Sequence, residues 1–232
     1  MPGSIGYTIW FLGSLLEVCV VLSAIAKHSF RRYLCLNFYM LFSFLISLGR
    51  YYVLNHFGLR SIEYKYFYFY SDAVLTIFLY LALITLYLHV FDEMKVEKYV
   101  RLTAVLLLVG TVLFSYAVVQ QSQNKMLTGA FFAELSQNLY FVGLVLTYVL
   151  WGAILKLRET RTQLIQLVLS LGIYFSAFAA TFALGNMFPN FQFFGYVVPV
   201  FGCLLPLAWA YAFWRLAPDA RMVPARLAVV PR

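Results

Sequence analysis

Long apolar stretches alternate with short polar segments along the whole chain. There are seven apolar stretches of about 20 residues, and a helix of that length crosses the roughly 30 Å hydrocarbon core of a bilayer. They lie at about 7–26, 34–54, 67–91, 102–120, 131–155, 164–186 and 193–214. The pattern predicts an all-α integral membrane protein, a bundle of seven transmembrane helices that forms a single domain over residues 1–232.

The basic residues occupy every second gap between these stretches. Thirteen of the seventeen Lys and Arg residues lie in the first, third and fifth gaps and in the short tail at 215–232. Because Lys and Arg remain on the cytoplasmic side of inserted helices, the alternation predicts an N-terminus outside and a C-terminus in the cytoplasm. We therefore expect a multi-pass protein of a bacterial inner (plasma) membrane. The N-terminal MPGSIGY carries no basic residue, which indicates a retained first helix rather than a cleaved signal peptide.

Composition narrows the class of protein further. Hydrophobic residues make up 63% of the chain and charged residues only 11%, which excludes a soluble globular domain. The net charge of +8 follows from the basic inner segments, so we expect it to face anionic membrane lipids rather than nucleic acid. We expect a protein partner, if the chain signals, to bind the same inner loops, because the tail is too short for an effector domain.

Small residues and prolines mark the last two of the expected helices. Gly172, Ser176 and Ala180 recur at intervals of four in the sixth stretch, so they form one stripe along that helix. Small side chains let two backbones approach closely, which predicts a helix-packing face. We expect this face to be used within the bundle, with a homodimer as the alternative. Pro199 and Pro206 are the only prolines inside the stretches, so only the last helix is expected to kink.

Four charged residues fall within the apolar stretches. Glu17 lies near the middle of the first stretch, whereas Arg50, Asp72 and Glu134 lie toward the outer ends of theirs. An ionised side chain at the centre of a bilayer costs about 2.5–3.5 kcal/mol on insertion scales, so each of these charges needs a partner or a function. We expect Glu17 to be protonated or hydrogen-bonded to another helix.

Polar side chains accompany each of the three outer charges at helical spacing. The three stripes are Ser43, Ser47 and Arg50; Asp72, Thr76 and Tyr80; and Glu134, Gln137 and Asn138. Stripes of this kind face the interior of a helix bundle, and the three charges share one depth. The pattern predicts a polar cavity that is open to the outside. Its aromatic lining is expected to be Tyr51, Tyr66, Tyr68, Tyr70 and Tyr140.

The predicted cavity can be interpreted in two ways. As a site for a small polar ligand, its candidate binding residues are Arg50, Asp72, Glu134, Asn138 and Tyr68. As a purely structural feature, Arg50 and Asp72 would form an ion pair between helices. The YKYFYFY run would then serve as an aromatic belt at the membrane interface.

Residues typical of enzymes and cofactor sites are scarce. No metalloprotease, serine hydrolase or phosphate-binding motif is present, so we do not expect catalysis. The three cysteines lack a CxxC spacing, and a haem between His28 and His89 rests on one residue pair; we expect no metal and no cofactor. All six lysines lie in gaps or at the ends of stretches, which excludes a retinal pigment.

Two segments carry a family resemblance. The segment from Tyr64 to Phe91 contains YFYFYSDA followed by an unbroken apolar helix, and the segment from Trp10 onward leads into KHSFRRY. Both resemble small uncharacterised seven-span membrane proteins of acidobacteria and related soil bacteria. The resemblance implies the seven-helix architecture along the whole chain and implies no function.

Three functions remain compatible with these patterns. The first is a receptor-like or ligand-binding module with an outward-facing polar cavity. The second is a small proton-coupled transporter or channel, in which Glu17 would carry the proton. The third is an accessory subunit of a larger membrane complex, held through the small-residue face on the sixth helix.

Overall fold

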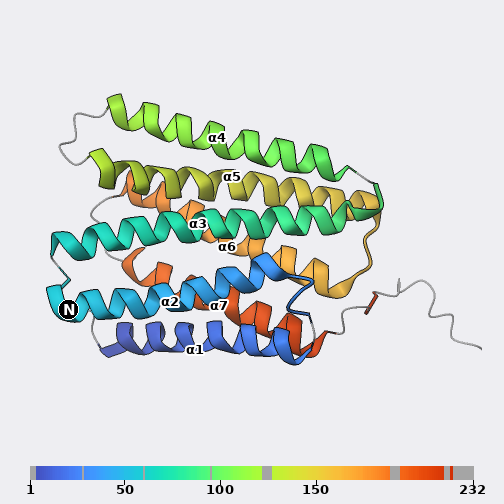
Figure 1. The fold of residues 1–232 in the computed structure, drawn as a ribbon, viewed down its shortest axis with the longest axis horizontal. Coiled ribbons are helices and arrows are strands. Elements are labelled where there is room, and N and C mark those ends of the chain that lie inside the picture. Colours follow the sequence, from blue (N-terminus) through green and yellow to red (C-terminus); the bar gives the residue numbers. More distant parts are fainter. Residues whose placement is uncertain are drawn as a thin grey trace, which may run out of the picture.

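In a computed structural model, the described residues of the chain form seven long α-helices (Figure 1). The structure describes residues 4–27, 29–59, 61–94, 96–121, 127–188, 194–216 and 220–221. The helices are α1 Ser4–Ala26, α2 Leu34–Phe57, α3 Ile62–Val90, α4 Glu97–Gln121, α5 Leu127–Leu157, α6 Thr162–Met187 and α7 Phe194–Arg215. A single 3₁₀ turn, Asp92–Met94, follows α3, and the described residues contain no β-strand beyond one isolated bridge. The predicted all-α fold is confirmed.

Six of the helices are long and apolar enough to cross a membrane within the described part of the chain. They are Tyr7–Ala26, Leu34–Phe57, Ile62–Val90, Glu97–Gln121, Gly129–Leu157 and Thr162–Gly185. Their mean hydropathy lies between 1.3 and 2.4 over the most apolar windows, which is the signature of helices in hydrocarbon. The protein is therefore a multi-pass membrane protein.

Several helices are longer than the apolar stretches that predicted them. The helix α3 begins at Ile62 because the side chain of Ser61 accepts a hydrogen bond from the Tyr64 amide at 3.0 Å and caps the first turn. The helix α2 continues to Phe57 and ends where Gly58 adopts a left-handed φ of 83°. The apolar pattern indicates which part of a helix lies in hydrocarbon, whereas the capping residues determine where the helix begins and ends.

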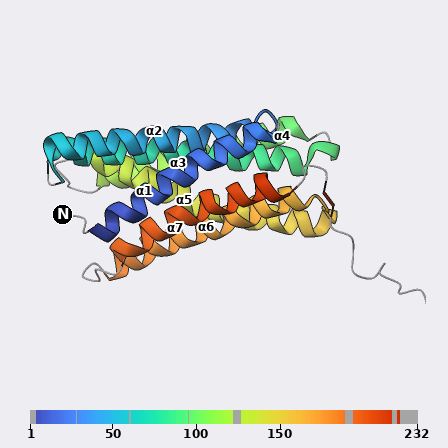
Figure 2. The same ribbon diagram turned by 90° about the horizontal axis from the view of Figure 1, so that it is seen from below.

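Six helices form a closed ring, and the seventh lies outside it. Around the ring, α1 packs against α2, α2 against α3, α3 against α5, α5 against α6, α6 against α7, and α7 back against α1. The helix α4 packs on α5 and, less extensively, on α3, and Figure 1 shows it at the edge of the bundle. Figure 2 shows the bundle from below, with α1 running diagonally between its two ring neighbours, α2 and α7. The interior enclosed by six helices is where buried polar groups can meet.

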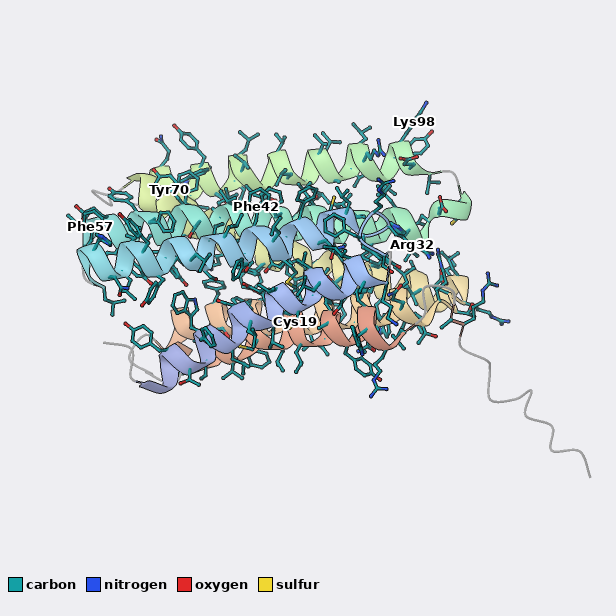
Figure 3. The ribbon with its side chains drawn as sticks, turned by 60° about the horizontal axis from the view of Figure 1, so that its bottom comes forward. Cys19, Arg32, Phe42, Phe57, Tyr70 and Lys98 are labelled. Atoms are coloured by element: carbon teal, nitrogen blue, oxygen red, sulfur yellow. The ribbon has the colours of Figure 1, made fainter. Side chains whose placement is uncertain are left out.

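The two ends of the bundle differ in their connections. The connections after α1, α3 and α5 and the segment after α7 share one end, which we call the tail end (Figure 1). Figure 3 shows Arg32 and Lys98 at the tail end, with Phe57 and Tyr70 at the opposite end. Two residues of the basic segments, Arg32 and Lys98, thus lie at the same end of the bundle.

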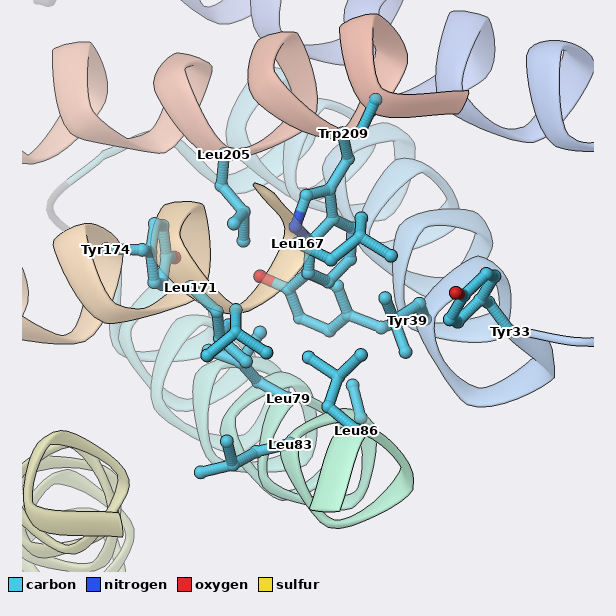
Figure 4. Packing of buried hydrophobic residues seen from close by; sticks show 14 of the residues in the cluster. Tyr33, Tyr39, Leu79, Leu83, Leu86, Leu167, Leu171, Tyr174, Leu205 and Trp209 are labelled. Atoms are coloured by element: carbon cyan, nitrogen blue, oxygen red, sulfur yellow. The ribbon is translucent and has the colours of Figure 1, made fainter. Parts of the chain in front are cut away.

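The tail half of the ring interior is packed with leucine. Leu79, Leu83, Leu86, Leu167 and Leu171 are fully buried, and we call this set the leucine layer (Figure 4). Between helices in lipid, association depends on close packing because the surrounding acyl chains are as apolar as leucine. The leucine layer therefore holds the ring together by shape rather than by exclusion of water.

The small-residue stripe on α6 serves partly as a packing face. A Cβ atom at Gly172 would lie 2.9 Å from the Thr147 Cγ2 atom of α5, so only glycine permits this approach. The Ser176 hydroxyl donates to the Gly172 carbonyl at 2.7 Å, and Ala180 is exposed. The stripe also lines an apolar groove of about 470 Å³ between α5 and α6. Packing within the bundle is confirmed for Gly172 and does not extend to Ala180.

Candidate functional site

Arg50 of α2 and Asp72 of α3 meet inside the ring, toward the end opposite the tail. Their side chains are 19% and 22% exposed, and the Arg50 Nη2 and Asp72 Oδ1 atoms are 3.9 Å apart. The Arg50 Nε atom donates to the Ser71 hydroxyl at 2.9 Å, and Nη2 donates to the Tyr68 carbonyl at 3.3 Å. The guanidinium also lies over the Tyr68 ring, 4.3 Å from its centroid. We call these four residues the Arg50 cluster.

Helical spacing on α3 places three of the four residues on one face. Tyr68, Ser71 and Asp72 are related by three and four residues, so their side chains emerge close together. The Ser71 hydroxyl donates to the Tyr68 carbonyl at 3.0 Å while accepting from Arg50, which fixes its orientation. The predicted meeting of Arg50, Asp72 and Tyr68 is confirmed as a structural fact.

The Arg50–Asp72 pair is loose. A charge-assisted N–H to O contact is about 2.7–2.9 Å long when fully formed, whereas these two groups remain 3.9 Å apart. The guanidinium instead donates hydrogen bonds to two neutral oxygens, the Ser71 hydroxyl and the Tyr68 carbonyl. Both charged groups therefore retain capacity for another polar partner between them.

Glu17 joins this region from α1. The hydroxyl of Ser43 on α2 donates to the Glu17 Oε1 atom, so the expected hydrogen bond to another helix is confirmed. The other carboxyl oxygen, Oε2, is fully buried and has no hydrogen-bond partner among the described residues. A buried polar atom without a partner is uncommon in proteins and calls for a specific explanation.

Glu134 and Asn138 do not join the Arg50 cluster. The Asn138 Nδ2 atom donates to the Ser115 hydroxyl of α4 at 2.9 Å and to Glu134 Oε1 at 3.3 Å. These two residues therefore face the α4–α5 interface, and the predicted convergence of Glu134 with Arg50 and Asp72 is wrong.

The residue of α5 that faces Asp72 is Ser136. Its hydroxyl lies close to the Asp72 carboxyl but is buried without a well-formed hydrogen bond. Residues two apart on a helix point about 200° from one another, so Ser136 and Glu134 necessarily face different neighbours. The sequence places an acid and a serine at nearly the same depth and leaves open which of them turns inward.

The predicted aromatic lining is wrong for two of its five tyrosines, Tyr51 and Tyr70. Tyr51 and Tyr70 are 46% and 40% exposed. Tyr51 packs on Trp10 with ring centroids 5.5 Å apart, and Tyr70 packs on Phe132 at 4.3 Å. A run such as YKYFYFY winds around its helix, so its tyrosines point in several directions and only Tyr68 contacts Arg50. The exposed tyrosines instead suit the belt interpretation.

Three buried tyrosines in the middle of the ring form a second polar feature. Tyr39 of α2, Tyr140 of α5 and Tyr174 of α6 are at most 8% exposed, and we call them the tyrosine triad. The Tyr140 and Tyr174 ring centroids are 6.3 Å apart. Figure 4 shows the Tyr39 ring extending across the bundle toward Tyr174.

Tyr39 and Tyr174 were not among the predicted interior residues. Tyr39 lies one turn before the stripe of Ser43, Ser47 and Arg50, so helical spacing could have included it, whereas Tyr174 has no charged residue at helical spacing within its apolar stretch. The buried Trp209 indole nitrogen of α7 also has no hydrogen-bond partner among the described residues, and its ring packs edge-on against Tyr39 at 6.1 Å. The interior polar groups thus extend deeper into the bundle than the charges alone indicate.

A separate ion pair organises the tail end. The Arg161 guanidinium donates to both carboxyl oxygens of Glu159, at 2.9 and 2.6 Å, and also to the His89 carbonyl at 2.8 Å. The hydrogen bonds from Arg161 hold the pKa of Glu159 below its ordinary value of 4.5. The Thr162 amide donates to the Ala220 carbonyl at 3.0 Å, which ties the segment after α7 to this loop. These contacts are structural and lie far from the Arg50 cluster.

One member of the histidine pair considered for haem, His28, lies outside the described residues. The other, His89, stacks on Tyr33 with its Nδ1 atom 2.7 Å from the Thr85 carbonyl. Among the described residues, no three His, Cys, Asp or Glu side chains gather as a metal site would require.

Comparison of the chain with protein-family models, with curated proteins and with solved structures found no match. The resemblance to acidobacterial membrane proteins therefore stays a prediction.

Proposed function

We propose that the protein is a receptor-like ligand-binding module of a bacterial inner membrane and that it binds a small polar ligand at the Arg50 cluster. The carrying observation is the loose Arg50–Asp72 pair, in which a guanidinium and a carboxylate 3.9 Å apart lie mostly buried between two helices. A site that offers one positive and one negative group suits a ligand that carries both charges, such as a zwitterionic amino acid.

In this proposal the tail end faces the cytoplasm and α7 is the seventh span. The grouping of the basic segments at the tail end supports the orientation, because Lys and Arg are retained on the inner side. The helix α7 has 22 residues and packs against both α1 and α6. If these two neighbours span the membrane, α7 lies in the membrane beside them. The Arg50 cluster then opens toward the outside.

The leucine layer favours binding over transport. A transporter needs a polar route to the far side, commonly built on broken helices near the midplane. Here the tail half of the ring is filled by fully buried leucines, and α1 to α6 carry no internal proline. A small proton-coupled transporter remains the alternative function, supported by the mid-depth carboxyl of Glu17. Any accessory role in a larger complex would use the exposed groove between α5 and α6.

Ligand binding is tested by thermal stabilisation of the purified protein in lipid nanodiscs. The probes are a panel of amino acids, with small amines and small carboxylates as singly charged comparisons. We expect at least one zwitterion to raise the unfolding temperature of the parent protein. The affinity of the protein for that zwitterion should fall about tenfold in Arg50→Gln. The matched control is Lys65→Gln, which removes an exposed cation from the same end of the bundle. Stabilisation that is identical in Arg50→Gln and the parent protein, or absent for every zwitterion, would contradict the proposal.

A further inference from the structure

The groove between α5 and α6 lies on the lipid-facing surface of the bundle. Its volume of about 470 Å³ is in the range of sites that hold small molecules. Both helices are long and apolar enough to cross a membrane, so the groove faces the acyl chains of the surrounding lipid. Its lining combines small residues of α6, such as Gly172 and Ser176, with large ones of α5, such as Tyr148 and Trp151.

The shape of this groove suits a narrow, flexible chain better than a second helix. The close approach that Gly172 permits is already used within the bundle, where a Cβ atom would lie 2.9 Å from the Thr147 Cγ2 atom. Bulky side chains project from both helices: Tyr148 of α5 is 63% exposed and Ile173 of α6 is 51% exposed. A second helix approaches closely only where small residues leave its path clear. An acyl chain is thinner and bends, so it fits between these side chains.

The helix α5 leads from the groove to a cationic segment at the tail end. Arg158 follows Trp151 by seven residues, which is about 10 Å along a helix. Lys156 and Arg158 are exposed, and neither forms an ion pair with a residue that the structure describes. The acid of the same segment, Glu159, is already held by Arg161. A surplus of positive charge therefore lies two helical turns beyond the groove.

Arg158 occupies a backbone position that normally favours glycine. Its φ of 52° makes it the one non-glycine residue with a left-handed conformation in the described part of the chain. The Arg158 amide donates to the Leu155 carbonyl at 3.3 Å, and the Glu159 amide donates to the Ile154 carbonyl at 3.0 Å. These two bonds form a Schellman motif, in which glycine is preferred at this position because it has no Cβ atom. Helix capping does not account for an arginine here, whereas a role for its charge does.

We propose that the groove and Arg158 together bind one anionic phospholipid, with an acyl chain in the groove and the phosphate at the Arg158 guanidinium. A guanidinium donates two parallel hydrogen bonds to phosphate oxygens. A headgroup without a positive charge of its own also compensates the surplus charge of Lys156 and Arg158. Lipid binding here goes beyond ligand binding at the Arg50 cluster. It shares with that proposal only the cytoplasmic position of the tail end, where anionic lipids are enriched.

Fluorescence quenching of Trp151 by brominated phospholipids tests occupancy of the groove. The full-length protein is reconstituted in vesicles whose lipids carry bromine midway along the acyl chains. The signal of Trp151 is the part of the fluorescence that Trp151→Phe removes, since the chain has three other tryptophans. We expect phosphatidylglycerol to reach Trp151 with an affinity about fivefold higher than phosphatidylcholine with the same chains, the effect of one cation near an anionic headgroup.

The variant Arg158→Gly separates lipid binding from folding. Glycine accepts the left-handed backbone, so this variant should unfold at a temperature no lower than the parent protein while losing the preference for phosphatidylglycerol. The matched control is Arg31→Gln, which removes an exposed cation from the α1–α2 connection. That connection lies across the ring from α5 and α6. A preference that persists in Arg158→Gly, or that falls equally in Arg31→Gln, would overturn the proposal.

The acyl-chain site itself is tested by filling the groove. Ser176→Phe places a ring among the lining residues and should reduce the quenching of Trp151 by both phospholipids at least twofold. Ala180→Phe is the control, because Ala180 is exposed one turn further along α6 and outside the lining of the groove. Equal quenching in Ser176→Phe and the parent protein would overturn the proposal. So would a Trp151 that no brominated lipid quenches in the parent, which is the result expected if a second copy of the chain covers the groove.

Discussion

The two halves of the ring interior are built in different ways. Toward the end opposite the tail, two charged side chains meet, and those of Arg50 and Asp72 stay 3.9 Å apart. In the tail half, fully buried leucines fill the interior, and the amides of Asn37 and Gln163 donate to backbone carbonyls while their side-chain oxygens lack partners among the described residues. One half carries charged groups, and the other carries apolar packing with neutral polar groups. The comparison indicates that charge and apolar packing are divided by depth.

Truncation in the leucine layer should have the largest effect. Leu83 is 0% exposed, so Leu83→Ala leaves a cavity and should lower the free energy of unfolding by about 2–5 kcal/mol. Leu45→Ala is the control, because Leu45 is 51% exposed on α2 and its loss should cost less than about 0.5 kcal/mol. Denaturant-induced unfolding in detergent micelles, followed by circular dichroism, measures both. Equal effects at the two positions would break the comparison between the halves.

Disruption of the Arg50–Asp72 pair should cost less. Its groups are partly exposed and its contact is long, so Arg50→Gln should lower the free energy of unfolding by about 1–2 kcal/mol, between the values for surface and fully buried pairs. A double-mutant cycle with Asp72→Asn isolates the coupling between the two residues. A loss in Arg50→Gln larger than in Leu83→Ala would show that the polar half, too, is built for stability.

The smallest effect on stability is expected from protonation of Glu159 at the tail end when the pH is lowered. The pKa of Glu159 is lowered by its hydrogen bonds from Arg161, so its stabilisation is fully present above the ordinary value of 4.5 and is lost as pH falls through the lowered pKa. Unfolding temperature measured between neutral and acidic pH should fall in the parent protein and fall less in Glu159→Gln. A parallel decline in both would show that this ion pair does not contribute.

The architecture could be predicted from charge and hydropathy, because these two properties do not depend on helix rotation. Arg32 and Lys98 lie at the tail end whatever direction each helix faces, and apolar length alone marks six membrane-crossing helices among the described residues. The meeting of Arg50 and Asp72 also followed, since each is the single charge within its stretch and the two helices are joined by a short connection.

The remainder of the site could not be predicted, because a helix that is apolar on every side gives no sign of its rotation. Glu134 was expected inside the ring, yet Ser136 occupies that direction and Glu134 faces α4. Tyr39 and Tyr174 are polar only at one hydroxyl each, which hydropathy does not register. In both cases the sequence does not reveal how the helix is rotated about its own axis. That rotation depends on packing between helices that are distant in the sequence.

Closure of the ring between α1 and α7 has a consequence for how the protein is made. The helix α1 enters the bilayer before α7, the neighbour against which it packs most extensively, so its mid-depth carboxyl is in the membrane before that contact forms. The hydroxyl of Ser43 is on the very next helix and can engage Glu17 as soon as α2 enters. The α1–α2 hairpin thus brings its own polar partner into the membrane, and the nascent chain need not hold a solitary acid in lipid while the other five helices are synthesised.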